Sequence, residues 1–224
     1  MENYYSNSLS ASRLQQCYDV APDRITQFLE AEINFVLEKI NGNCSILDLG
    51  CGYGRVSIRL ADKAEKVVGI DISEDNIKLA KEFCIDKKNC KFFTMDAADL
   101  KFEDNIFDMV ICVQNGISAF KVPSYKLLEE ADRVCKKGGV ILFSSYSEKI
   151  WKERVEWFEI QAGHGLIGEI DYNQTKNGNI VCKDGFKATT YTKEDFMELA
   201  SKFNITANVY EIDNSSLFCE MKKV

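Results

Sequence analysis

The segment 46–55, which reads ILDLGCGYGR, constrains the fold of this chain more than any other feature. Its apolar start is interrupted by Asp48, and glycine then stands at every second position, as Gly50, Gly52 and Gly54. A short apolar run that ends in glycine predicts a buried parallel strand entering a tight turn. Glycine accepts positive φ and lets a ligand approach the backbone closely. The helical pattern that follows places this loop at a helix N-terminus, which favours a nucleotide-like ligand.

The spacing of these glycines bears on which ligand is expected. The dinucleotide fingerprint, G-x-G-x-x-G, would require its third glycine where Arg55 stands, and here Gly54 comes one residue earlier. Asp48, inside the strand, is also unusual for a dinucleotide site. On this motif alone, an ordinary glycine turn after a strand stays an alternative to a ligand-binding loop. Motifs elsewhere in the chain are needed to distinguish the two.

Length and composition are those of one ordinary globular domain. The chain has 224 residues, of which 46% are apolar and 28% charged, and it is long enough for a complete α/β core. No apolar run approaches the roughly 18 residues of a membrane helix. The N-terminus lacks the basic start and apolar centre of a signal peptide. We therefore expect a cytoplasmic protein without a membrane partner.

The net charge disfavours a nucleic-acid-binding protein, and the cysteine pattern disfavours a disulfide-stabilised one. The net charge of −7 argues against nucleic acid as a partner. The nine cysteines are scattered and form no C-x-x-C pair, which indicates reduced thiols packed in strands and helices. We expect neither a disulfide framework nor a metal site.

Further predicted strands end in residues suited to a ligand. The segment 66–73 reads KVVGIDIS and places Asp71 about twenty residues after the first glycine, where α/β nucleotide sites present a carboxylate to the ribose hydroxyls. The third strand is followed by Asp96 and the fourth by Val113. In an open parallel sheet, ligands bind beyond the carboxyl ends of the strands, where the strand order reverses. We expect these residues to share one site.

The segments outside this core are helical at the front and rich in aromatic residues near the end. Residues 12–40 have a helical pattern broken at Pro22, and one interpretation of this segment is plain packing on the sheet. A helix opened by Pro123 is expected to end in the KKGG at 136–139. Residues 147–191 predict a helix and two or three short strands with more aromatic area than a crossover needs. Two closing strands complete the pattern.

Several of these motifs together resemble one known family. The D-x-G-x-G-x-G arrangement that begins at Asp48 resembles motif I of the class I S-adenosylmethionine (SAM) methyltransferases. Asp71 and Asp96 match the next two positions of the family's pattern, so that the resemblance covers about residues 44–146. The chain is similar to those members of the family that act on small molecules.

The resemblance implies the fold. We expect an α/β, Rossmann-like methyltransferase sheet of seven strands in the order 3214576 with strand 7 antiparallel, with N-terminal helices and a β insert after strand 5. Residues 1–224 would form a single domain. It would comprise an N-terminal helical lid at 1–43, a SAM-binding core at 44–146 and a substrate-side insert at 147–191.

The same resemblance implies which residues bind SAM. The glycine loop and Asp48 would hold its methionine end, and Asp71 its ribose. Asp96 and the backbone of Ala97 would contact the adenine. The full set of cofactor-binding residues expected in this way is Asp48, Gly50, Cys51, Gly52, Gly54, Asp71, Ile72, Asp96, Ala97, Val113 and Tyr18.

The function implied is transfer of a methyl group from SAM to the nitrogen, oxygen or sulfur of a small-molecule acceptor. Candidates for a general base are His164, whose pKa range suits the task, and the tyrosines Tyr146 and Tyr191. The family's enzymes for DNA bases carry a Pro-Pro-aromatic motif after strand four. This chain, which has only Pro22 and Pro123, lacks that motif.

Three alternatives stay open at this point. A SAM-binding sensor or partner subunit would keep the cofactor motifs without turnover. An enzyme of the NAD or nucleotide-sugar class would need the other glycine spacing. The aromatic residues of 147–191 would also suit a dimer face, so we expect either a monomer or a homodimer.

Overall fold

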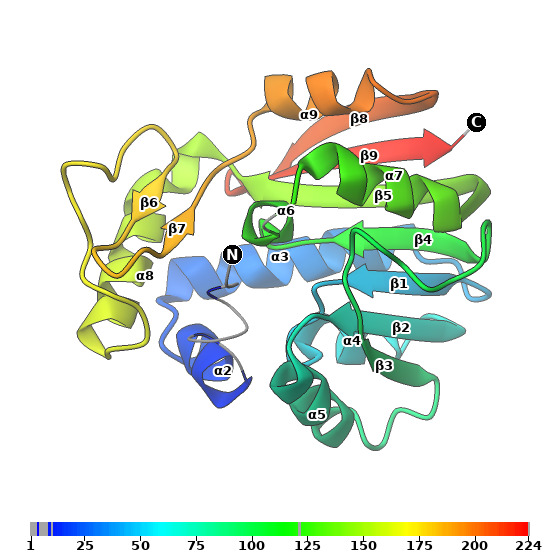
Figure 1. The fold of residues 1–224 in the computed structure, drawn as a ribbon, viewed down its shortest axis with the longest axis horizontal. Coiled ribbons are helices and arrows are strands. Elements are labelled where there is room, and N and C mark those ends of the chain that lie inside the picture. Colours follow the sequence, from blue (N-terminus) through cyan, green and yellow to red (C-terminus); the bar gives the residue numbers. More distant parts are fainter. Residues whose placement is uncertain (1–3, 5–8, 10, 121, 224) are drawn as a thin grey trace.

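A computed structural model describes residues 4, 9, 11–120 and 122–223. Its centre is a seven-stranded sheet in the order β3-β2-β1-β4-β5-β9-β8 (Figure 1). A separate two-stranded ribbon pairs β6 with β7. The strands are β1 Ser45–Leu49, β2 Lys66–Asp71, β3 Cys90–Thr94, β4 Phe107–Cys112, β5 Cys135–Tyr146, β6 Ile180–Val181, β7 Lys187–Ala188, β8 Ile205–Ile212 and β9 Ser216–Lys223.

The pairing of the strands confirms the predicted order and direction. Strands β1 to β5 are parallel to one another, and β9 is antiparallel to both β5 and β8. In order of the sheet's own strands this is 3214576 with the last strand of the chain antiparallel. The central strands are short apolar runs because both of their faces are covered. Asp48, paired with Gly69 on one side and Ile111 on the other, is the exception in β1.

Helices cover both faces of the sheet. Apolar residues of α3 and α4 pack on one face together with α5, and those of α7 and α9 pack on the other. The helices are α2 Ala11–Asp19, α3 Asp23–Lys39, α4 Arg55–Leu60, α5 Glu74–Phe83, α6 Gly116–Ala119, α7 Ser124–Val134, α8 Trp151–Gly163 and α9 Lys193–Ala200, with a 3-10 turn η1 at Glu148–Ile150.

The expected helix end at 136–139 is wrong. Helix α7 ends at Val134, and β5 begins at the next residue, so that the KKGG sequence lies within the strand. The pairing of β4 with β5 shifts register between Phe107 and Met109, which accommodates the glycines as an irregularity in the ladder. A side chain on Gly139 would lie 2.9 Å from the carbonyl oxygen of Asp108, so this close strand approach requires glycine.

The predicted N-terminal lid divides into two parts. The long helix α3 packs its apolar stripe along the sheet, through residues such as Ile33 and Val36. Of the two helices described in this segment, α2 is the one that lies beyond the carboxyl ends of the parallel strands, next to α8 and the β6–β7 ribbon (Figure 1). The predicted lid residues 1–3, 5–8 and 10 lie outside the described part of the chain. These parts share a hydrophobic cluster that includes Cys17, Trp157 and Phe186. The site is therefore covered jointly by α2 and the insert.

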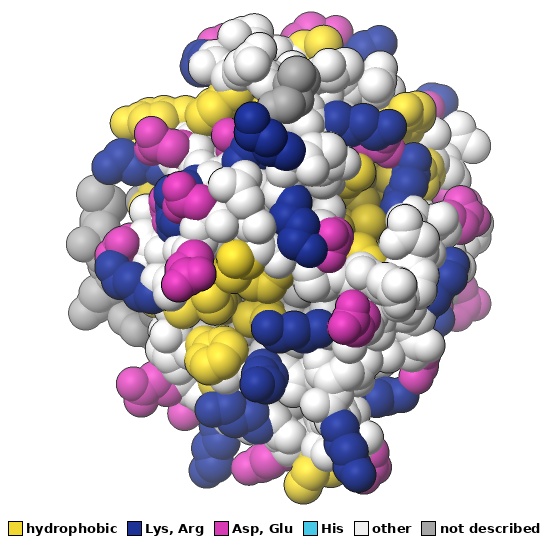
Figure 2. All heavy atoms as spheres, turned by 90° about the vertical axis from the view of Figure 1, so that its right-hand side faces the viewer, with side chains coloured by type: hydrophobic (Ala, Val, Ile, Leu, Met, Phe, Trp, Pro, Cys, Tyr) yellow, Lys and Arg dark blue, Asp and Glu magenta, His cyan; other side chains and the backbone are white. Residues whose placement is uncertain are grey.

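The opposite end of the molecule has a different character. Seen from the amino ends of the parallel strands, basic and acidic side chains are interspersed, with smaller hydrophobic patches between them (Figure 2).

Within the described ranges, no helix combines the length and the hydropathy that a membrane crossing requires.

Candidate active site

The loop between β1 and α4 depends on its glycines. Gly50, Gly52 and Gly54 all have positive φ, at 71°, 54° and 87°. Gly54 is the N-cap of α4, and a side chain there would lie 3.0 Å from the sulfur of Cys84, the residue that follows α5. The first two glycines face the pocket described below, whereas Gly54 permits close packing of two helices.

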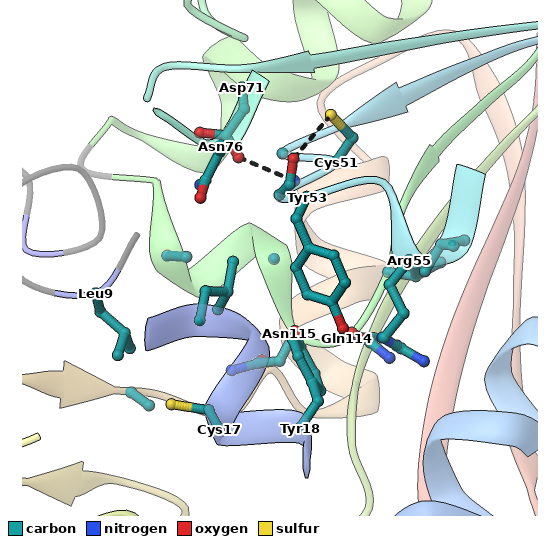
Figure 3. Close-up of a pocket in the computed structure, with 18 of the residues that line it drawn as sticks. Leu9, Cys17, Tyr18, Cys51, Tyr53, Arg55, Asp71, Asn76, Gln114 and Asn115 are labelled. Atoms are coloured by element: carbon teal, nitrogen blue, oxygen red, sulfur yellow. Dashed lines mark hydrogen bonds between the residues drawn. The ribbon is translucent and has the colours of Figure 1, made fainter. Parts of the chain in front are cut away.

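Asp71, the last residue of β2, fixes the shape of this loop. Its Oδ2 accepts a 3.0 Å hydrogen bond from the backbone N–H of Gly52, and its Oδ1 accepts one of 2.9 Å from Ser73 N–H (Figure 3). Burial raises the pKa of this carboxyl, and the surrounding N–H donors oppose that shift. A carboxylate accepts about four hydrogen bonds, so Asp71 keeps acceptor capacity toward the pocket.

Asp48 is a buried carboxyl at the end of β1. It is 2% exposed, and its Oδ2 accepts a 2.7 Å hydrogen bond from the Ser57 hydroxyl of α4. Burial raises its pKa to about 6, so Asp48 is largely ionised at neutral pH and protonated in mild acid. An ionised carboxylate at this depth favours a cationic group of a ligand.

A covered pocket lies above the loop, where the strand order reverses between β1 and β4. Its empty volume is about 1210 Å³, including the mouth. The glycine loop forms one side, and Cys17 and Tyr18 of α2 lie opposite it (Figure 3). Residues of α8 complete the lining. It is lined by Leu9, Leu14, Cys17, Tyr18, Asp48, Gly50, Cys51, Gly52, Tyr53, Arg55, Val56, Asp71, Ile72, Asn76, Val113, Gln114, Asn115, Gly116, Ala119, Phe120, Tyr146, Trp157, Phe158, Gln161, Phe186 and Ala188.

Arg55 brings a buried cation to this pocket. Its guanidinium carbon lies 4.6 Å from the centre of the Tyr18 ring, so that the cation is stacked on α2. Its Nε and Nη2 are buried and have no hydrogen-bond partner among the described residues. Buried donors of a charged group without acceptors are costly, which indicates that a ligand supplies an anionic group here.

The loop after β4 is held in an unusual conformation. Gln114 and Asn115 both have left-handed backbones, with φ of 56° and 57°. The Asn115 amide donates to Ser118 Oγ at 2.6 Å and to the Thr189 carbonyl at 2.9 Å, and its oxygen accepts from Ser145 Oγ at 2.7 Å. Two consecutive residues with a strained left-handed backbone persist only where surrounding contacts hold that conformation, and such strain often occurs at functional sites.

Glu32 of α3 supports the same loop from below. It is fully buried, and its carboxylate accepts hydrogen bonds from Gln114 N–H at 2.9 Å and from Ser216 Oγ at 2.5 Å. Burial raises its pKa to about 7, against the lowering effect of these donors. Glu32 joins α3, the loop after β4 and β9 in one network beneath the pocket.

The two parts of the cover are bonded to each other. The Trp157 indole N–H donates to the Cys17 carbonyl at 2.8 Å. Arg13 Nη2 donates to the carbonyls of Gly165 and Leu166 at 2.7 and 3.0 Å. These contacts join α2 to α8 and to the turn that follows it.

The pocket brings together most of the residues predicted to bind SAM, along with one candidate base. Those that line it are Tyr18, Asp48, Gly50, Cys51, Gly52, Asp71, Ile72, Val113 and Tyr146. The others do not line it. Gly54 faces Ala80 and Cys84 rather than the pocket. Asp96 is exposed with its Oδ1 bonded to Ala98 N–H, and Ala97 is buried beside the third strand.

The other two candidate bases also lie outside the lining. His164 is exposed at the C-cap of α8. Tyr191 packs its ring on Phe196 at 5.6 Å, and its backbone N–H donates to Ser145 Oγ at 2.8 Å. Burial raises the pKa of Tyr146, the one that does line the pocket, so its hydroxyl is neutral at physiological pH.

Sequence reasoning missed several residues of the site. Arg55 directly follows the last glycine, so its position in the motif could have indicated it. Asn76 lies on the first turn of α5 and bonds the backbone N–H of Ala11 at 2.6 Å, which depends on tertiary structure. Glu32 and Gln161 face inward from helices, and nothing in their local sequence distinguishes them from surface residues.

Comparisons with known proteins support the class that the sequence motifs resemble, the SAM-dependent methyltransferases. The family model of a methyltransferase domain matches residues 46–139. The chain is similar to the demethylmenaquinone methyltransferase of Staphylococcus aureus, with 31% identity over 153 residues, which cover 63% of this chain and 62% of that relative. The chain spans about 42% to 62% of the length of the curated relatives it matches.

Solved structures share the fold. The protein PH0226 of Pyrococcus horikoshii OT3 matches with a TM-score of 0.71 and 23% identity over 100% of both chains. A SAM-dependent methyltransferase of Methanosarcina mazei matches with a TM-score of 0.61 and 20% identity, over 85% of this chain and 97% of that one. The match of residues 46–139 to the methyltransferase family model, together with the shared class I fold, confirms the resemblance that the sequence motifs indicate.

Proposed function

We propose that this protein binds SAM in the pocket and transfers its methyl group to the nitrogen, oxygen or sulfur atom of a small molecule. The observation that carries this proposal is the bond between Asp71 and the Gly52 N–H. It fixes a glycine loop at the point where the strand order reverses, directly below a covered pocket. That geometry suits a nucleoside with a charged tail.

The residues around the loop fit the two ends of SAM. Asp71 and Ile72 would hold the ribose and the adenine face, and Asp96 and Ala97 would extend the adenine contact through the backbone after β3. Asp48 would face the ammonium group. The unpaired Nε and Nη2 of Arg55 would bind the carboxylate, which supplies the acceptors that these buried donors lack.

When bound, SAM supplies a methyl group that is already activated by the sulfonium. The protein's part is to orient the acceptor and exclude water. Correct positioning supplies roughly 7–11 kcal/mol of a barrier of this kind. The joined cover of α2 and α8 would limit the access of solvent to the bound ligands. Val113, with the strained loop of Gln114 and Asn115, would form the wall where the acceptor meets the methyl group.

Proton removal plays a smaller part in this proposal. Tyr146 is the candidate base that lines the pocket, and its raised pKa favours a hydrogen-bond donor over a base. His164 and Tyr191 would need to move to reach the acceptor. We therefore expect an acceptor whose nucleophilic atom requires no strong base.

The alternative is a SAM-binding sensor or partner subunit that performs no transfer. The shape of the cover favours the enzyme, because α8 and the ribbon leave lined space next to the loop. We also propose the division of the single domain into a lid within 1–43, a SAM-binding core at 44–146 and a substrate-side insert at 147–191. The acceptor would be a small molecule, and the protein a monomer or homodimer.

The test is incubation of the purified protein with methyl-labelled SAM and a mixture of metabolites, followed by detection of labelled products. A labelled small molecule, formed by the wild type and not by Asp71→Asn, would support the proposal. SAM binding without a labelled product in any mixture would favour the sensor. No SAM binding would refute both.

A further inference from the structure

The two sides of the pocket differ in charge. The lining residues that carry a formal charge at neutral pH are Asp48, Arg55 and Asp71, and all three belong to the glycine-loop side. The side formed by β5, α8 and β7 carries none among the described lining residues. Its side chains are Tyr146, Trp157, Phe158, Gln161, Phe186 and Ala188.

The aromatic residues of this second side form a connected wall. The ring of Phe158 lies 5.6 Å from that of Trp157 and 5.7 Å from that of Phe186, at angles of 70° and 40°. These residues are at most 5% exposed, so their orientations are fixed by packing. Such a wall offers flat apolar surface to a flat ligand.

A buried arginine fixes the wall from outside the pocket. The Arg154 guanidinium lies 4.0 Å from the centre of the Tyr146 ring and 5.7 Å from that of Phe158. Its Nη1 donates to Thr190 Oγ1 at 2.6 Å and to the Gly178 carbonyl at 3.1 Å. Arg154 does not line the pocket, so its charge holds the aromatic rings in place without facing the acceptor.

Gln161 is the one polar side chain from α8 on this wall. It is 3% exposed and lines the pocket, and its amide makes no hydrogen bond to any residue that the structure describes. Gln114, across the pocket, has a buried Nε2 that also lacks a partner among these residues. Gln161 and Gln114 are therefore neutral amides whose hydrogen-bonding capacity is not fully used by the described residues, and Gln161 stands among apolar side chains of α8.

We propose that the acceptor is an uncharged, planar aromatic molecule with a neutral hydrogen-bonding substituent, and that Gln161 selects it. This inference rests on the proposed function. None of the described side chains that line the pocket on this wall carries a formal charge, so a charged acceptor buried there would contact no counter-charge, which is unfavourable. An aromatic ring packs on the wall, and its substituent satisfies the Gln161 amide, which an unsubstituted ring would leave unpaired.

Binding measurements with three matched probes test the acceptor class. We would saturate the protein with S-adenosylhomocysteine and titrate 2-naphthol, 2-naphthoate and decahydro-2-naphthol by calorimetry. The proposal predicts that 2-naphthol binds at least tenfold more tightly than either of the others. Equal or tighter binding of the charged or the saturated probe would overturn it. Saturation with S-adenosylhomocysteine is measured first, and its failure would count against the proposed function instead.

A variant tests the role of Gln161. In the wild type, 2-naphthol should bind about tenfold more tightly than naphthalene, and Gln161→Leu should remove that preference while leaving naphthalene binding unchanged. Gln16→Leu makes the same change on the exposed side of α2 and should preserve the preference. If Gln161→Leu retains the wild-type preference, with normal S-adenosylhomocysteine binding, Gln161 does not select the acceptor.

Discussion

The indole N–H of Trp157 donates a 2.8 Å hydrogen bond to the backbone carbonyl of Cys17, although 140 positions separate the two residues. This bond joins α8, which follows the fifth strand, to α2, which precedes the first. The cover of the pocket is therefore one bonded unit built from both ends of the core. A change that loosens one part of this cover should therefore loosen the other part as well.

Trp157→Phe should loosen the cover. The buried Cys17 carbonyl would lose its donor, which costs about 1–3 kcal/mol. We expect faster amide hydrogen exchange across Ala11–Asp19, and in the wild type slower exchange there when S-adenosylhomocysteine is bound. Trp151→Phe is the control, because the Trp151 indole N–H makes no hydrogen bond to a described residue. Unchanged exchange in Trp157→Phe would mean that packing alone holds α2.

Gly52→Ala should weaken SAM binding. Gly52 has φ of 54°, where a residue with a side chain costs about 1–2 kcal/mol, and its new methyl group would lie 3.0 Å from Leu14 in the pocket. Affinity for SAM, measured by calorimetry, should fall at least tenfold. Gly42→Ala serves as the control, since a side chain there meets nothing within 4 Å. A folded Gly52→Ala protein with wild-type affinity for SAM would show that this loop does not bind the cofactor.

Arg55→Met should have opposite effects on binding and on stability. Loss of a charged hydrogen bond to the SAM carboxylate corresponds to about 1.5–3 kcal/mol, or roughly 10- to 100-fold in affinity. The cofactor-free protein should be no less stable, because two buried nitrogens without acceptors are removed. The control, Arg59→Met on the same helix, removes a half-exposed ion pair with Glu30 and should change both quantities little. Reduced stability with normal SAM affinity would make Arg55 a structural residue.

Glu32→Gln should flatten the dependence of stability on pH. Burial raises the Glu32 pKa from 4.5 to about 7, so between these values the folded protein holds a proton that the unfolded chain has lost. This contribution to stability is complete below pH 4.5 and is lost as pH rises through 7, by about 3 kcal/mol in total. Urea unfolding at pH 5 and pH 7.5 should show a smaller difference in the free energy of unfolding for the variant. An equal difference would mean that Glu32 is ionised throughout.

The core was predictable because its signals are local. The glycine spacing after β1 and the acids that end β2 and follow β3 lie in short segments whose periodicity fixes the element type. The strand order followed from the family resemblance. The helical segments between the strands indicated that neighbouring strands run parallel. The end of α7 was the exception, because the pairing of β5 with β4 outweighed the helix-ending preference of its glycines.

The site was predictable only in part. Asp48 and Asp71 line the pocket as expected, because strand ends in a parallel sheet share one edge. His164 was a candidate by residue type alone, and its exposed position follows from where α8 ends. Glu32 and Gln161 are oriented by packing between distant helices, and that information is absent from any local stretch of sequence.

Calorimetric titration with SAM and with NAD tests the central claim most directly, on the wild type and on Asp71→Asn. The wild type should bind SAM at one site and give no heat with NAD. Asp71→Asn keeps an acceptor for the Gly52 N–H but loses the carboxylate that would hold the ribose, and it should bind SAM about 10- to 100-fold more weakly. Binding of NAD in place of SAM, or an unchanged SAM affinity in Asp71→Asn, would contradict the account.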